Sequence, residues 1–291
     1  RPIRLYARDQ KSGTWDTFET LVLGTRQLSR QAARFESNDE LSDQVAADPA
    51  AIGFVGLASV RNAKALAVRH GESPAMAPQK LLVATEDYPL ARRLYLYRPT
   101  ASTHVVANEF IGFAQHDMGQ TLVEKVGFVA QTPTEIAFAD QAGPESYQTL
   151  AKHAHRLSLN FRFRPGSAEL DNKAKRDAKR LADYLKHDKL AMHIQLVGFS
   201  NQKKDANLAG VLSRLRATAV KTALFEQGIV TESVMGFGAT RPLGATKSGT
   251  SKNDRVEVWL YPGANAVAID QLKTAKPAAA SAPLFKLANQ P

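Results

Sequence analysis

The clearest pattern of hydrophobic and polar positions lies between residues 150 and 262, where short alternating runs are separated by longer helical repeats. Alternation at every second residue predicts a strand, and apolar residues three or four apart predict one face of a helix. Strands are therefore predicted at 157–163, 192–198, 234–237 and 256–260, and helices at 170–185 and 205–227. This β-α-β-α-β-β order predicts an α+β sandwich with both helices on one face of the sheet.

The longer predicted helix, 205–227, carries a hydrophobic stripe. The stripe is expected to face the sheet and consists of Leu208, Leu212, Leu215, Ala219 and Leu224. Gly228 follows the helix, where a residue in the left-handed conformation commonly ends one.

The remaining chain divides into three parts. Residues 1–130 alternate strand-like and helical stretches, with strands predicted at 3–6, 52–56 and 94–97, and form a separate α/β block. Residues 131–149 carry Pro, Thr, Gly and Ser and are predicted to be a linker. Residues 263–291 are rich in Ala and Pro without periodicity, which predicts a disordered tail. Two domains also suit a length of 291 residues.

The chain is basic, with a net charge of +10 and a pI near 9.7. Such a surface favours anionic partners: nucleic acid, phosphate, anionic lipid or an acidic cell wall. A basic surface that serves only solubility is the plainer alternative. We expect no nucleic-acid partner, because the sequence has neither an RNA-binding aromatic signature nor a Cys–His finger.

The sequence lacks the residues that several kinds of chemistry require. There is no cysteine, so disulfides, thiolate nucleophiles and Cys-ligated zinc are excluded. The seven histidines show no HExxH spacing, and we expect no metal and no cofactor. The sequence contains no run of 18 apolar residues, so no transmembrane helix is predicted. The sequence begins Arg-Pro-Ile without Met or a signal peptide, so we expect a piece of a longer precursor.

A series of motifs in the C-terminal block resembles the OmpA-like family. The series consists of GFSN at 198–201, LSRLRA at 212–217, GI at 228–229, GFG at 236–238 and NDRVEV at 253–258. The resemblance covers about residues 155–262. It implies binding to the peptidoglycan of a Gram-negative periplasm, and export is inferred from it alone.

The resemblance implies a site at Ser200, Asn201, Arg216 and Arg255. In the family, a loop Asp pairs with the ammonium of the stem-peptide diaminopimelate, and the guanidinium of a helix Arg binds its carboxylate. Here the loop residue is Asn201, and Asp254 replaces a common Arg. The lost charge is expected to weaken wall binding about tenfold. The alternative is a domain that keeps the fold without the ligand.

The N-terminal block contains a candidate anion site at Arg8, Ser12, Gly13 and Thr14. Hydroxyls and free backbone N–H groups at a helix start suit an anion, and glycine permits close approach. Alternatively, Ser and Thr only cap the helix.

The segment around these four residues is similar to the PstS-like phosphate-binding periplasmic proteins. The resemblance extends to the segments 37–40, 48–56, 88–95 and 119–129. The resemblance implies the second lobe of a two-lobed binding protein, with phosphate or a similar oxyanion bound between the lobes and the first lobe preceding residue 1. The alternatives are another oxyanion, or a lobe kept for contacts with partners.

Together these features predict a non-enzymatic periplasmic protein in which an oxyanion-binding lobe is tethered to the cell wall. A structural wall linker, whose N-terminal lobe binds protein and no solute, is the main alternative. An enzyme with Ser12 or Ser200 as nucleophile is the third. Neither serine lies in a G-x-S-x-G elbow or at a spacing that suggests a triad, so no catalytic residue is assigned.

Overall fold

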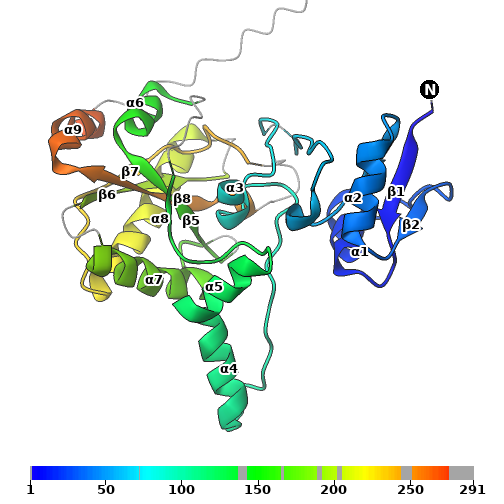
Figure 1. The fold of residues 1–291 in the computed structure, drawn as a ribbon. Coiled ribbons are helices and arrows are strands. Elements are labelled where there is room, and N and C mark those ends of the chain that lie inside the picture. The colour runs from blue at the N-terminus through cyan, green and yellow to red at the C-terminus, as the bar shows by residue number, and fades with distance from the viewer. Residues whose placement is uncertain are drawn as a thin grey trace, which may run out of the picture. The chain divides into compact units, whose positions relative to one another are not determined.

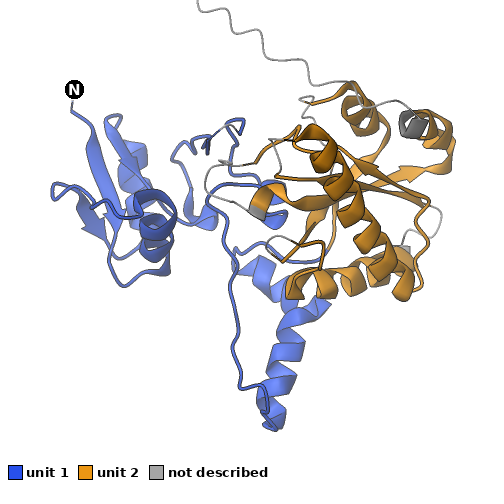
Figure 2. Cartoon of the chain, turned by 180° about the vertical axis from the view of Figure 1, so that it is seen from behind, with its two compact units in different colours: residues 1–132 blue, residues 133–291 orange. Residues whose placement is uncertain are grey.

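The computed structural model describes residues 2–71, 73–136, 143–164, 167–188, 192–201, 205–243 and 251–274 (Figure 1). The chain divides into two compact units, residues 1–132 and residues 133–291 (Figure 2). Helices and strands mix in both units, so the protein is of the mixed α/β class. In the part of the chain that the structure describes, no helix has both the length and the apolar character needed to cross a membrane.

A five-stranded sheet forms the centre of the second unit, in the order β4-β5-β8-β6-β7. The strands are β4 (Glu135–Ile136), β5 (His155–Arg162), β6 (Met192–Phe199), β7 (Ser233–Gly236) and β8 (Arg255–Pro262). β6 runs parallel to β7, and the β4–β5, β5–β8 and β8–β6 pairs are antiparallel. All four strands predicted in this block are confirmed, and β4 is an additional edge strand.

Two helices, α7 (Asn172–Asp188) and α8 (Ala206–Glu226), cover one face of this sheet (Figure 1). Alternate residues of the central strands, such as Leu159, Leu196 and Val258, form a buried core with them. Asp205 caps α8 by accepting a hydrogen bond from the N–H of Leu208, at 2.9 Å. The predicted β-α-β-α-β-β order is therefore confirmed between β5 and β8.

The opposite face of the sheet is covered by α6 (Glu145–His153) and α9 (Ala266–Thr274), which the sequence analysis did not predict. Tyr147 of α6 and Ile269 of α9 are fully buried against Trp259 and Tyr261. The segment expected to be a linker thus supplies β4 and the start of α6. The first part of the expected tail forms a short 3-10 turn (Gly263–Asn265) and α9, while residues 275–291 lie outside the described residues.

The buried face of α8 agrees only in part with the predicted one: Leu224 is fully buried and Ala219 packs against the core, as predicted. Leu208 and Leu215, expected to face inward, are 42% and 51% exposed, whereas Ser213 and Ala217 are fully buried. The cause is a close helix–sheet approach: a Cβ added to Gly198 of β6 would lie 1.9 Å from the carbonyl oxygen of Ser213. Only small residues fit at such a contact, so the larger leucines lie to its side.

The first unit contains a small parallel sheet in the order β2-β1-β3. Its strands are β1 (Arg4–Arg8), β2 (Ala33–Phe35) and β3 (Ala51–Gly53). Its helices are α1 (Gly13–Phe18), continued by a π-helical turn (Glu19–Leu23), α2 (Asn38–Ala47), α3 (Lys80–Ala84), α4 (Val105–Gln115) and α5 (Asp117–Lys125). Ser37 caps the start of α2, because its side chain accepts a hydrogen bond from the N–H of Glu40.

The strand predicted at 94–97 is wrong. These residues form no strand, and their side chains are between 55% and 87% exposed. A strand forms only where a neighbouring chain accepts and donates its backbone hydrogen bonds, and no described strand pairs with this segment.

Candidate ligand-binding sites

The register of two strands creates the candidate site in the second unit. β6 and β8 are antiparallel, with Phe199 opposite Arg255. The loop that follows β6 therefore lies beside the residues that precede β8. Asn201 therefore lies next to Asn253 and Asp254, although these residues are 52 and 53 positions further along the chain. α8 packs on β6 and brings Arg216 to the same place.

Asp254 joins the parts of this site. Its Oδ1 accepts a hydrogen bond from the backbone N–H of Asn201 at 2.7 Å and one from Nη1 of Arg216 at 2.6 Å. Nε of Arg216 donates to the carbonyl oxygen of Ser167 at 3.2 Å. Arg216 thus meets the 200–201 loop through a carboxylate of its own chain. From the sequence alone, Asp254 is only a departure from the family pattern and has no predicted role.

The side chain of Asn201 is held by a second amide. Its Oδ1 accepts a hydrogen bond from Nδ2 of Asn253 at 2.9 Å, and Oδ1 of Asn253 accepts one from the N–H of Leu243 at 2.6 Å. Asn253 is buried, and Asn201 is half-buried. The carbonyl oxygen of the Asn201 side chain, which the sequence analysis expected to meet a ligand ammonium, therefore already has a donor.

Arg216 and Asp254 each keep one polar atom that forms no hydrogen bond with the rest of the described chain: Nη2 of Arg216 and Oδ2 of Asp254. Neither atom is fully buried, although the two side chains are only 5% and 18% exposed. The site thus presents one cationic donor and one anionic acceptor side by side. Their fixed geometry and low exposure favour charge-assisted hydrogen bonds to a ligand.

The other two predicted site residues lie deeper. Arg255 is fully buried: its Nε donates to Oε1 of Glu257 at 3.0 Å, its Nη1 donates to the carbonyl oxygen of Arg241, and its guanidinium stacks over Phe199 at 3.9 Å. Ser200 is also buried, and its N–H donates to the carbonyl oxygen of Gly238 at 2.8 Å. Both residues support the loop from within the fold.

In the first unit, Arg8 and Ser12 are occupied by local contacts. The Arg8 guanidinium is buried and donates to the carbonyl oxygens of Phe35, at 3.1 Å, and Glu36, at 2.5 Å. Ser12 caps α1, because its Oγ accepts a hydrogen bond from the N–H of Trp15 at 3.1 Å. No hydrogen bond between described residues joins the Arg8 guanidinium to Ser12, Gly13 or Thr14.

A different arginine approaches the start of α1. A Cβ added to Gly13 would lie 2.8 Å from a guanidinium nitrogen of Arg92, and Arg92 also forms a 3.8 Å ion pair with Asp16. The Arg92 side chain is 41% exposed. Arg92 belongs to the segment 88–95 and is not among the predicted site residues, because nothing in the spacing links it to Gly13.

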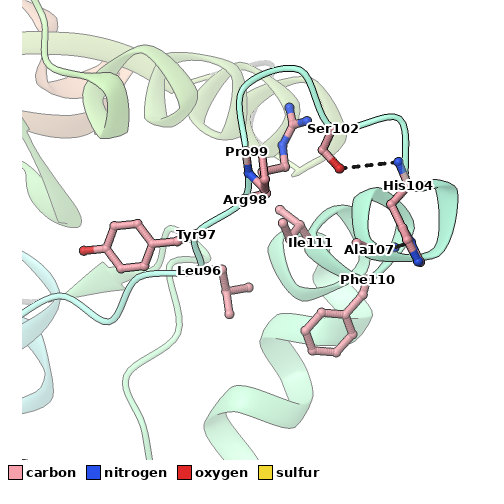
Figure 3. A pocket seen from close by; sticks show the side chains of 9 residues that line it. All are labelled: Leu96, Tyr97, Arg98, Pro99, Ser102, His104, Ala107, Phe110 and Ile111. Atoms are coloured by element: carbon pink, nitrogen blue, oxygen red, sulfur yellow. Dashed lines mark hydrogen bonds between the residues drawn. The ribbon is translucent and has the colours of Figure 1, made fainter.

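A pocket of about 480 Å³ also lies in the first unit, between α4 and the extended segment before it (Figure 3). Its lining is mainly apolar and includes Leu96, Tyr97, Phe110 and Ile111. This lining does not suit an oxyanion. Among the described residues, no cluster of three His, Asp or Glu side chains is arranged to hold a metal ion.

Comparison with known proteins agrees with the motifs of the second unit. Residues 162–255 match the model of the OmpA family. The second unit therefore contains an OmpA-family domain, and the resemblance inferred from the motifs is confirmed.

The N-terminal region is weakly similar to two curated proteins. Protein SphX of Synechocystis sp. is 29% identical over 136 residues, which cover 44% of this chain and 40% of SphX. The phosphate-binding protein PstS of Borreliella burgdorferi is 24% identical over 134 residues, which cover 44% of this chain and 48% of PstS. The chain thus spans less than half the length of the curated relatives it matches.

Among solved structures, the periplasmic domain of MotB from Helicobacter pylori aligns with 18% identity and a TM-score of 0.34, covering 48% of this chain and 93% of that domain. The peptidoglycan-associated lipoprotein of Burkholderia pseudomallei aligns with 22% identity and a TM-score of 0.31, covering 40% of this chain and 96% of that protein.

Proposed function

We propose that this protein is a non-enzymatic binding protein of the Gram-negative periplasm, held on peptidoglycan by its OmpA-family domain. The observation that carries the proposal is the position of Arg216. Its Nη2 is available at the loop of Asn201, inside a domain that matches the OmpA family. In this reading, Nη2 donates to a carboxylate of the diaminopimelate in the wall's stem peptide.

The first unit is proposed to act as one lobe of an oxyanion receptor, with phosphate as the leading ligand. Support comes from the similarity to the phosphate-binding protein PstS and from the surroundings of Gly13. The N–H groups of Gly13 and Thr14 and the nearby Arg92 guanidinium would donate to the anion, while Arg8 and Ser12 hold the loop. The relatives' unmatched length leaves room for a second lobe that completes the site.

Wall binding is tested by co-sedimentation of the full chain with purified diaminopimelate-type sacculi. Because the chain carries a net charge of +10, an acidic wall attracts it without any site. Arg214→Ala is therefore the matched control: Arg214 is exposed on the same helix, and its loss changes the net charge equally. Arg216→Ala is expected to release the protein and Arg214→Ala to leave it bound. Equal pelleting of both variants would contradict the proposal.

Oxyanion binding is tested separately, by titrating phosphate into the full chain and into Arg92→Ala in a calorimeter. The account expects binding that Arg92→Ala weakens. Heat of binding that is the same for both proteins would contradict the role of Arg92.

The alternative function, a wall linker whose first unit contacts protein, is favoured by one observation. The segment 94–97 and α4 expose large apolar side chains, among them Tyr97 at 87% and Phe110 at 59%. Exposed clusters of this kind commonly mark protein contacts. This reading expects wall binding without any response of the first unit to phosphate.

A further inference from the structure

The candidate wall site contains a carboxylate, although its loop residue is an amide. Asn201 is uncharged, and its side-chain oxygen already accepts a hydrogen bond from Asn253. Asp254, which immediately precedes β8, lies against both the Asn201 backbone and Arg216. The negative charge of the site is therefore supplied by a residue 53 positions further along the chain.

Two atoms of the pair form no hydrogen bond with the residues that the structure describes, and they select a particular chemistry. Oδ2 of Asp254 accepts hydrogen bonds, and Nη2 of Arg216 donates them. A simple anion would be attracted by Arg216 and repelled by Asp254. A simple cation would be attracted by Asp254 and repelled by Arg216. A group that carries an ammonium and a carboxylate on one carbon, as a free amino-acid end does, satisfies both atoms at once.

We propose that Asp254, and not Asn201, is the residue that receives the ligand's ammonium, so that Asp254 and Arg216 together bind a zwitterionic amino-acid group. This assignment rests on the proposed wall function and adds to it a specificity-determining residue. The ion pair between Asp254 and Arg216 orients both side chains before the ligand arrives. Preorganisation of this kind limits the entropy lost on binding.

A rival account of the same geometry makes the opposite prediction. If Asp254 occupies the place of the ligand's carboxylate, it competes with the ligand for Arg216 and blocks the site. Removing its charge then frees Arg216 and strengthens binding. The Asp254→Asn variant separates the two accounts, because the amide oxygen can still accept the hydrogen bonds from Asn201 and Arg216 while the charge is gone.

The experiment measures the affinity of the full chain for diaminopimelate-type sacculi. We expect Asp254→Asn to weaken binding about tenfold or more, since a charge-assisted hydrogen bond becomes a neutral one. The double variant Asn201→Asp/Asp254→Asn returns a carboxylate from the other side of the loop and is expected to restore binding. This rescue also shows that the loss did not come from misfolding.

The outcomes separate this assignment from the wall function. If the unchanged chain pellets and Asp254→Asn pellets equally or more strongly, Asp254 does not receive the ammonium and only this assignment fails. If Asp254→Asn weakens binding and the double variant does not restore it, a carboxylate at position 201 does not replace the one at position 254. The assignment then also fails. If the unchanged chain does not bind sacculi above the level of Arg216→Ala, the wall function itself fails.

Discussion

Tyr147 of α6 donates a 2.8 Å hydrogen bond from its hydroxyl to Oε2 of Glu257 on β8, and both side chains are fully buried. Glu257 also accepts hydrogen bonds from Arg255, at 3.0 Å, and from Trp259, at 3.2 Å. A helix that begins before the predicted domain boundary thus helps to neutralise a carboxylate in the central strand. Buried carboxylates are tolerated only with such partners.

Removing this hydroxyl is expected to destabilise the second unit. Tyr147→Phe leaves Glu257 with one donor fewer in a buried place, which costs about 1–3 kcal/mol of unfolding free energy. Urea unfolding of the full chain, followed by tryptophan fluorescence, measures the change, since Trp259 contacts the same cluster. Tyr97→Phe is the control, because Tyr97 is 87% exposed. Equal midpoints for both variants would contradict the role of the hydrogen bond.

The same tyrosine predicts the response to alkaline pH. Burial, together with the charge of Glu257, raises the pKa of Tyr147 well above its ordinary value of 10, and burial with Glu232 does the same for Tyr261. Both tyrosines are therefore protonated in the native state at a pH where the unfolded chain loses the protons. The stabilisation is complete below about pH 10 and declines above it. Denaturant midpoints between pH 8 and 11 are expected to fall above pH 10, and less steeply in Tyr147→Phe. A flat profile would contradict the shifts.

Packing of α9 supplies a third prediction. Ile269 is fully buried among residues of the face that α6 also covers. Ile269→Ala is expected to cost about 2–5 kcal/mol, the usual range for truncating a buried isoleucine. Val267→Ala, on the same helix with the side chain 71% exposed, should change little. Thermal unfolding of the two variants distinguishes them, and similar shifts in both would show that α9 does not pack on the sheet.

The close approach of α8 to β6 leads to a fourth prediction. In Gly198→Ala the new Cβ would meet the carbonyl oxygen of Ser213, so the helix must shift, at a cost of about 1–3 kcal/mol or more. Because Arg216 lies one turn further along α8, wall binding should weaken as well. Gly210→Ala is the matched control: nothing lies within 4 Å of its Cβ, and alanine favours the helix by about 0.5–1 kcal/mol.

The strength of the local sequence pattern decides which elements of the second unit can be predicted. The strands and helices between β5 and β8 were predictable because their periodicity is strong. α6 and α9 were missed because Pro, Gly and Ala nearby suggested a linker and a tail. Yet Tyr147, Leu150 and Ala154 already lie at helical spacing and gave a usable signal. Leu208 and Leu215 of α8 were wrongly predicted to face inward, because hydrophobicity alone ignores the close approach of the helix at Gly198.

The candidate site was only partly predictable for a similar reason. Arg216 and Asn201 belong to motifs that the sequence displays directly. The role of Asp254 depends on the pairing of β6 with β8, and Arg92 approaches Gly13 only through the folded chain. Neither neighbour follows from spacing along the sequence.

The most direct test of the account is competition for the wall. Full-length protein bound to diaminopimelate-type sacculi is washed with free meso-diaminopimelate or with pimelate, which has the same carbon chain and both carboxylates but no ammonium. The account predicts release by meso-diaminopimelate and none by pimelate at equal concentration, because Asp254 requires the ammonium and Arg216 the carboxylate beside it. Equal release by both compounds, or by neither, would contradict recognition of a zwitterionic amino-acid group at this site.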